Sequence, residues 1–273
     1  MNASTTSTPL PATPSPSRSF VSAHPMWISV VVLLLVIACW ELAPAVFGIP
    51  AFIVPKASAV AREFANAFES NRLVYHTLMT TWQVVVGFVL GSLLGAAGGY
   101  LLGLSRTVEV VLSPYILALQ IAPKVAFAPL FVMWFGFTVY PKILVAVLIV
   151  FFPVLVNVLT AIKSIEPQTI NLARSFNATR SQVFWKIEFP ASLPALFAGL
   201  RIGSTLAVIG VVVGELVGGN FGLGFLLTLG EGQANTPLVF VAIIMLSLIG
   251  IGAYFAVELL ERRVLHYLPK SSN

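Results

Sequence analysis

Long apolar runs separated by short polar segments dominate the pattern of this sequence. A helix needs about 20 apolar residues to cross the hydrocarbon core of a bilayer. We predict six such spanning helices, namely Met26–Phe47, Thr77–Leu104, Val108–Phe135, Tyr140–Ile162, Leu193–Val217 and Leu238–Leu260. The predicted fold class is therefore an all-α polytopic membrane protein with about six transmembrane helices.

The third of these runs is interrupted more than the others. Pro114, Pro123 and Pro129 lie within it, and so do the polar residues Gln120 and Lys124. A proline inside a helix leaves a backbone carbonyl without its partner, and lipid offers no replacement donor. We therefore expect this span to be broken and to pack inside protein.

The second run carries glycine at every fourth position over most of its length. Such spacing leaves one face of a helix almost without side chains, so another helix backbone can approach closely. Either tight static packing or a surface that slides during transport would explain the pattern. The glycines are Gly87, Gly91, Gly95, Gly99 and Gly103.

Composition supports the membrane class. Of the 273 residues, 58% are hydrophobic and 9% are charged, and the mean hydropathy is +0.96. A soluble domain carries roughly 25% charged residues. The net charge of +5 is interpreted as the Lys and Arg excess of cytoplasmic loops, not as a sign of nucleic-acid binding.

The distribution of Lys and Arg predicts the orientation in the membrane. With the N-terminus inside, nine of these residues fall on the cytoplasmic side and four on the outer side, and the four are Lys56, Arg62, Arg72 and Lys142. This asymmetry favours two cytoplasmic termini. We expect a disordered tail over 1–24, a transmembrane domain over 25–269 and a short tail over 270–273. In the outer loop, the pattern of Ser58–Glu69 predicts a helix on the membrane surface.

A polar segment over 163–190 interrupts the otherwise apolar second half of the chain. Pro167 suits the first turn of a helix, and Asn177 suits the left-handed residue that ends one. A second short helix is predicted over Thr179–Ile187, ended by Phe189-Pro190. The two helices should lie along the cytoplasmic membrane surface and offer apolar residues to a partner.

Three polar residues in or near the spans are candidates for the translocation path, namely Lys124, Gln120 and Glu215. Ionisable residues inside a membrane are costly and often mark a path. Lys124 could attract an anionic solute, although an ion pair or an interfacial position would also explain it. Glu215 precedes Gly218-Gly219, where we expect irregular backbone. The sequence has no phosphate-binding loop, catalytic constellation or metal-ligand spacing, so we expect a non-enzyme that binds neither ATP nor another cofactor.

The run LARSFNATRSQVFWKIEFPASLPALFAGLRI resembles the cytoplasmic coupling loop, called the EAA loop, of permease subunits of ATP-binding-cassette (ABC) importers. The family pattern places its EAA on Asn171, Leu172 and Ala173 and its glycine on Asn177. Other stretches resemble the nitrate/sulfonate/taurine branch of the family, and the resemblance runs from residue 27 to residue 269. These stretches are WEL at 40–42, IVPKASAV at 53–60, APLFVMWFG at 128–136 and GVVVGELVGG at 210–219.

The resemblance implies the fold of a type I ABC importer permease with cytoplasmic coupling helices, in a bacterial inner membrane. It implies two copies of a cytoplasmic ATP-binding subunit, an extracytoplasmic solute-binding protein and a permease homodimer. The cargo would be a small anionic solute of the sulfonate, taurine, nitrate or aromatic acid type. The implied ATPase-coupling residues are Asn171, Leu172, Ala173, Arg174, Ser175, Phe176 and Asn177.

Two other classes remain open from the residues alone. A secondary transporter or channel would work without partners, but it has no need of a docking segment such as 163–190. It would also be expected to show an internal repeat, which the sequence does not display. A membrane scaffold without a path is the other class, against which the broken third run and the glycine-lined second run argue.

Overall fold

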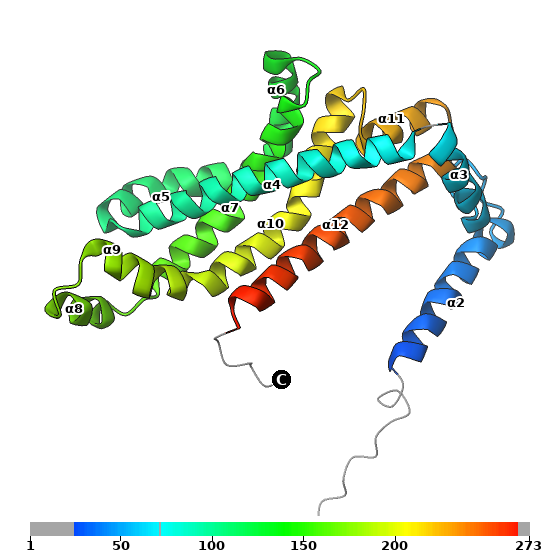
Figure 1. Cartoon of the computed structure of the whole chain (residues 1–273). Coiled ribbons are helices and arrows are strands. Elements are labelled where there is room, and N and C mark those ends of the chain that lie inside the picture. Colours follow the sequence, from blue (N-terminus) through cyan, green and yellow to red (C-terminus); the bar gives the residue numbers. More distant parts are fainter. Residues whose placement is uncertain (1–24, 71, 267–273) are drawn as a thin grey trace, which may run out of the picture. The chain divides into compact units, whose positions relative to one another are not determined.

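The computed structural model describes residues 25–70 and 72–266, and the chain forms two compact units, Met1–Ala57 and Ser58–Asn273 (Figure 1). Each unit is described by itself. The tails predicted over 1–24 and 270–273 lie outside the described residues.

The first unit contains one spanning helix, α2 (Pro25–Val46), which confirms the first predicted span. The indole Nε1 of Trp40, within α2, donates a hydrogen bond at 3.0 Å to the carbonyl of Pro55, which lies beyond the helix. This bond ties the segment after the helix back to its last turns.

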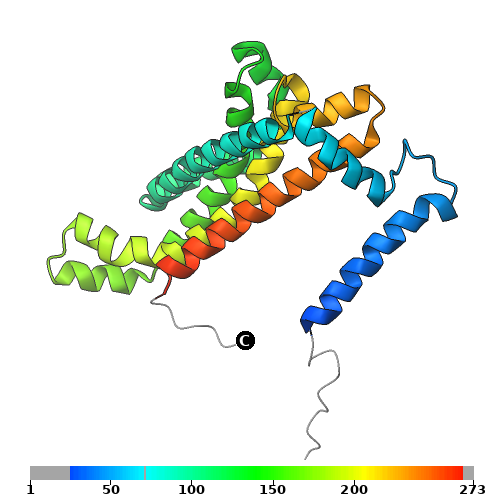
Figure 2. The same cartoon turned by 45° about the vertical axis from the view of Figure 1, so that its right-hand side comes forward.

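The second unit is built from helices throughout its described residues. Its long helices are connected by short turns, and shorter helices lie at both ends (Figure 2). The elements are α3 (Ala57–Glu69), α4 (Leu73–Gly103), α5 (Arg106–Ile121), η1 (Lys124–Ala126), α6 (Phe127–Phe135), α7 (Tyr140–Lys163), α8 (Pro167–Ser175), α9 (Arg180–Val183), η2 (Phe184–Glu188), α10 (Phe189–Gly218), α11 (Leu223–Gly232) and α12 (Thr236–Val264).

The predicted number of spans is confirmed within the described residues. Five segments are long and apolar enough to cross a membrane, and they contain α2, α4, α7, α10 and α12. The sixth is the pair α5 and α6, which are bent by 73° at the break between them. The helix expected on the membrane surface is also present, as α3, and Glu63 on it accepts a 2.9 Å hydrogen bond from the amide of Asn235.

The third predicted span is broken as expected, but the expectation that it packs inside protein is wrong for α5. No residue of α5 is buried in this chain. Glu109 of α5 forms an ion pair at 2.6 Å with Lys163 at the end of α7. After the break, α6 does pack inward, because Ala128 joins a cluster with Val145 and Ile149 of α7.

Helix α7 packs against both α4 and α10 (Figure 1). A Cβ built on Gly95 or Gly99 of α4 would lie 2.5 Å from a backbone oxygen of α7. A Cβ on Gly210 or Gly214 of α10 would lie 2.6 or 2.7 Å from an α7 Cα on the other side. Glycine stripes therefore let two helices approach α7 at backbone distance, which is the close approach predicted from the α4 pattern.

Lys142, counted among the outer cations and included in the predicted span from Tyr140, lies in the first turn of α7 with 1% of its surface exposed, a burial that the sequence did not indicate. One detail of the sequence prediction is wrong. The short helix predicted to end at Phe189-Pro190 instead runs into α10 through η2, which has π-helical geometry. There the N–H of Phe189 bonds the carbonyl of Phe184, five residues back. The wider turn shifts the hydrogen-bond register just before Pro190, which has no N–H to donate.

Candidate functional site

Helix α8 ends in a Schellman turn centred on Asn177. Asn177 has φ of 55°, the left-handed conformation predicted from its position. Its N–H donates to the carbonyl of Arg174 at 2.9 Å, and the N–H of Ala178 donates to that of Ala173 at 3.1 Å. These two bonds satisfy carbonyls that the helix end would otherwise leave free. The chain direction between α8 and α9 is therefore fixed by local hydrogen bonds.

The start of α9 is fixed in the same way. The hydroxyl of Thr179 accepts from the N–H of Gln182 at 3.3 Å, and the amide oxygen of Gln182 accepts from the N–H of Thr179 at 2.8 Å. This reciprocal capping box begins a helix two residues after the Schellman turn. The α8–α9 element is thus a defined helix–turn–helix and not a loose loop.

The seven predicted coupling residues do not form one surface. Leu172 and Phe176 are four residues apart on α8, and their side chains are 60% and 80% exposed. Ile170 and Arg174 share the opposite face, because two residues correspond to about 200° of helical rotation. That second face lines a cavity within the chain. Asn171, Ser175 and Asn177 are exposed, and Ala173 is half-buried.

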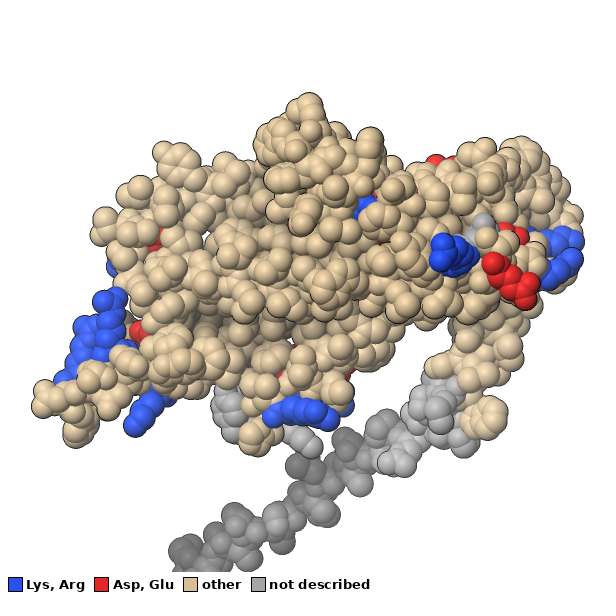
Figure 3. Space-filling view, turned by 45° about the horizontal axis from the view of Figure 1, so that its top comes forward, with Lys and Arg blue, Asp and Glu red and all other residues tan. Residues whose placement is uncertain are grey.

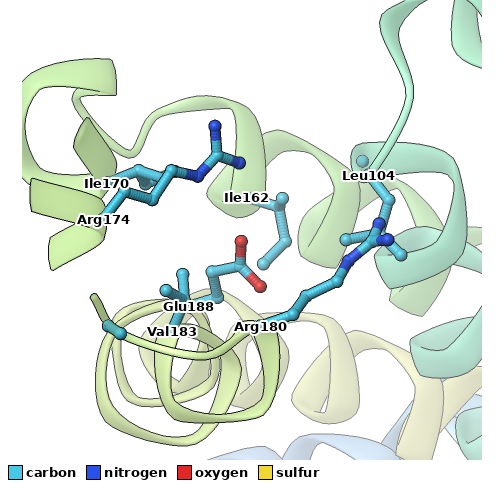
Figure 4. Close-up of a pocket in the computed structure, with 9 residues that line it drawn as sticks. Leu104, Ile162, Ile170, Arg174, Arg180, Val183 and Glu188 are labelled. Atoms are coloured by element: carbon cyan, nitrogen blue, oxygen red, sulfur yellow. The ribbon is translucent and has the colours of Figure 1, made fainter.

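The cavity has a volume of about 510 Å³ and lies between α8–α9 and the ends of α4 and α7 (Figure 4). Arg174 and Arg180 reach toward it, and the carboxylate of Glu188 lies between them in this view. The hydroxyl of Tyr100 on α4 donates to Glu188 Oε2 at 2.9 Å. Lys and Arg side chains gather at this end of the second unit, whereas most of its middle carries no charge on the face shown (Figure 3).

At the opposite end of the second unit, the carboxylate of Glu215 is completely buried. Its two oxygens share the hydroxyl proton of Thr80, at 2.9 and 3.1 Å, and Oε2 accepts a hydrogen bond from the N–H of Gly224 at 2.7 Å. The amide of Gln83 donates a longer bond at 3.4 Å. Glu215 therefore joins α4, α10 and the first turn of α11.

The segment between α10 and α11 is held by the same cluster. The N–H of Gly222 donates to Nδ1 of His76 at 2.9 Å, and the N–H of Leu223 donates to the hydroxyl of Thr80 at 2.8 Å. Gly222 has φ of +101°, and a Cβ there would lie 2.0 Å from Glu215 Oε1. The irregular backbone expected after Glu215 is present, and glycine is required in it.

Lys142 of α7 lies close to this cluster, beside Phe221. Its ammonium group lies 3.5 Å from the centre of the Phe221 ring and has no hydrogen-bond partner among the described residues. It also interacts electrostatically with Glu215. A buried ammonium is costly unless opposite charge or a ring face compensates for the lost water, and here Glu215 and Phe221 supply these two contacts.

Of the three predicted path residues, the structure brings two together. The ammonium of Lys124 donates to the carbonyl of Gln120, in the last turn of α5, and lies 5.0 Å from the centre of the Phe152 ring. Glu215 is part of the separate buried cluster. Within the described residues, no group of three or more His, Cys, Asp or Glu side chains is placed to hold a metal ion.

The sequence reasoning missed most partners in these two regions. His76, Thr80, Gln83 and Gly87 recur on one face of the second run at intervals of three or four residues, and this helical spacing would have indicated a buried polar face. Tyr100 carried no such signal, because its partner Glu188 is 88 residues away in sequence.

Comparison with known proteins gives the same family across most of the chain. The family described as "Binding-protein-dependent transport system inner membrane component" matches residues 87–266. A riboflavin transport system permease protein of Chloroflexus aurantiacus is 41% identical over 87% of this chain and 88% of its own length. A formylaminopyrimidine transport permease protein of Halalkalibacterium halodurans is 34% identical over 87% and 94%.

A taurine transport system permease protein of Escherichia coli is 30% identical over 82% of this chain and 83% of its own length. The family match includes α7, the α8–α9 element, Glu215 and the first turn of α11. The chain therefore belongs to the family of binding-protein-dependent transport system inner membrane components, the permease subunits of ABC transporters, in their sulfonate/taurine-type branch.

Proposed function

We propose that this chain forms the translocation path of an ATP-driven importer and works as a homodimer. Two copies of a cytoplasmic ATPase dock on α8, and an extracytoplasmic solute-binding protein docks at the opposite end. The observation that carries the proposal is the exposed apolar pair Leu172 and Phe176, held outward by the Schellman turn at Asn177.

The physical argument is that no described part of the chain covers this apolar pair. Helix α8 is short and polar overall, and it follows the end of the spanning helix α7. Apolar side chains of this size stay exposed to water at a cost of roughly 25 cal/mol per Å². A groove on an ATPase subunit that receives both side chains would remove them from water and bind the helix.

The proposed orientation of the chain in the membrane rests on the distribution of charge. Lys163, Arg174, Arg180 and Lys186 all lie at the α8 end, and loops rich in Lys and Arg stay in the cytoplasm. In the proposal, the α8–α9 element lies on the side where ATP is available. The helices α3 and α11 and the Glu215 cluster then lie on the side that receives solute from a binding protein.

The test is to replace both exposed side chains, with Leu172→Ser and Phe176→Ser, and to co-express the variant with an ATPase subunit. We expect the ATPase to fail to co-purify with the variant permease and solute uptake to stop. Phe137→Ser is the matched control, because Phe137 is 67% exposed beside α7 at the other end. Retention of the ATPase by the double variant would refute the docking surface. Uptake that continues without an ATPase would favour the partner-independent transporter instead.

The cargo is proposed to be a small anionic solute of the sulfonate, taurine, nitrate or aromatic acid type. Lys124 is the candidate that attracts it, at the break between α5 and α6. Two relatives named for riboflavin and for formylaminopyrimidine transport favour a second candidate, a flat heteroaromatic solute. Lys124→Gln separates the two, because it should reduce uptake of an anionic solute and leave that of a neutral heterocycle unchanged.

A further inference from the structure

The cavity beside α8 combines an apolar wall with the side chains of two arginines. Gly103, Leu104, Ile162, Ile170 and Val183 supply the wall. Neither Arg174 nor Arg180 makes a hydrogen bond or an ion pair with another described residue. A planar guanidinium presents five donors suited to the oxygens of a phosphate or carboxylate. Two such groups beside one cavity have donor capacity that the chain itself does not use.

We propose that this cavity binds the phosphate headgroup of an anionic phospholipid, with Arg174 and Arg180 as the ligands of the phosphate. The wall would contact the first carbons of the acyl chains. The site is distinct from the ATPase-docking face, because Arg174 lies on the side of α8 opposite to Leu172 and Phe176. The proposal needs no ATPase and therefore does not depend on the proposed coupling role.

The depth of the cavity favours a lipid over a soluble anion. Gly103 is the last residue of α4, and Ile162 is the last but one of α7. Both helices are long and apolar enough to span a membrane, so the proposal places the cavity where the hydrocarbon core gives way to the headgroups. Basic pockets at the ends of spanning helices are where lipid headgroups are recognised. A soluble phosphate would gain nothing from the apolar wall.

The charge of the cavity favours a lipid with net negative charge. Two arginines and Glu188 give it a formal charge of +1. Glu188 opposes an anion, but its Oε2 already accepts a hydrogen bond from the hydroxyl of Tyr100 on α4. A zwitterionic lipid such as phosphatidylcholine adds a cationic group that both arginines would repel. Phosphatidylglycerol adds no such charge and matches the site.

The test uses the full-length permease in nanodiscs of equal parts phosphatidylcholine and phosphatidylglycerol. The protein is extracted in mild detergent, and the retained lipids are identified by native mass spectrometry. We expect the natural chain to retain severalfold more phosphatidylglycerol than phosphatidylcholine. The double variant Arg174→Gln, Arg180→Gln should lose this preference, and the double lysine variant, which keeps the charge but not the paired donors, should keep part of it.

Arg106→Gln with Arg263→Gln is the matched control, because it removes two exposed arginines from the same end of the helices but outside the cavity. Circular dichroism and gel filtration establish that each variant is folded. The proposal is overturned if the Arg174→Gln, Arg180→Gln variant keeps the lipid preference of the natural chain. It is also overturned if the control variant loses as much of that preference as the cavity variant does.

Two further arms separate the lipid from other anions. Glycerol phosphate, the soluble headgroup alone, should displace retained phosphatidylglycerol weakly. If it competes as well as the whole lipid, the cavity is a soluble phosphate site and the lipid proposal fails. If the glutamine variant keeps its lipid but no longer co-purifies with an ATPase, the arginines contact the partner protein, which also overturns the proposal.

Discussion

The backbone N–H of Gly224 donates a 2.7 Å hydrogen bond to Oε2 of Glu215, so the first turn of α11 is bound to the last turn of α10. The hydroxyl of Thr80 on α4 reaches the same carboxylate at 2.9 Å. One buried side chain thus fixes three helices at the end opposite α8. Its removal should loosen that end as a whole.

Glu215→Gln tests this role while keeping the size of the side chain. The amide retains one acceptor oxygen but turns a donor toward Thr80 or Gly224, and Lys142 loses its nearby negative charge. A buried group without its hydrogen-bond partner costs about 1–3 kcal/mol. We expect a lower free energy of unfolding by about that amount, measured by denaturant titration in detergent. Glu231→Gln on exposed α11 surface should change it by less than about 0.5 kcal/mol.

Gly222→Ala should destabilise the same region for a steric reason. Its φ of +101° disfavours any side chain, and the new Cβ would lie 2.0 Å from Glu215 Oε1. Gly136→Ala is the matched control, because its φ of +70° imposes similar strain but nothing lies within 4 Å of the new Cβ. The control should cost about 1–3 kcal/mol, and Gly222→Ala should cost clearly more. Equal shifts in Tm would show that the clash with Glu215 is relieved by movement of the loop.

Gly95→Ala probes the close approach of α4 to α7. The added Cβ would lie 2.5 Å from the backbone oxygen of Phe151, which cannot move without shifting α7. Overpacking of this kind costs about 1–3 kcal/mol, so the melting temperature should fall. Gly252→Ala on α12 has nothing within 4 Å of its Cβ and should leave the melting temperature unchanged or raise it. A neutral Gly95→Ala would mean that the helices separate easily.

Asn177→Val tests the turn that ends α8. A β-branched residue disfavours φ of 55°, at a cost of roughly 1–2 kcal/mol, so α8 should lose its fixed direction. We expect solute uptake to fall relative to ATP hydrolysis in the assembled complex, and Asn177→Gly to keep both. Gln168→Val, on the exposed first turn of α8, is the control for the added apolar surface. Normal uptake with normal ATPase stimulation in Asn177→Val would contradict the coupling role of this turn.

The apolar pattern alone determined the class of this protein and its spans. About 20 apolar residues have one stable arrangement in a bilayer, because every backbone group must be paired within the segment. The break near Pro123 and the left-handed Asn177 were predictable for the same reason, since both follow from local backbone chemistry.

Only the tertiary structure decided which polar groups meet. Lys142 was counted on the outer side from its charge and position, and charge alone does not show whether a residue is buried. Glu215 and Thr80 are 135 residues apart in sequence, and no local rule relates them. The two faces of α8 also differ only through packing, since one face lines a cavity made by α4, α7 and α9 and the other meets no part of the chain that the structure describes. Local backbone chemistry thus determined where helices form, and long-range contacts determined which helix faces are buried and which remain exposed.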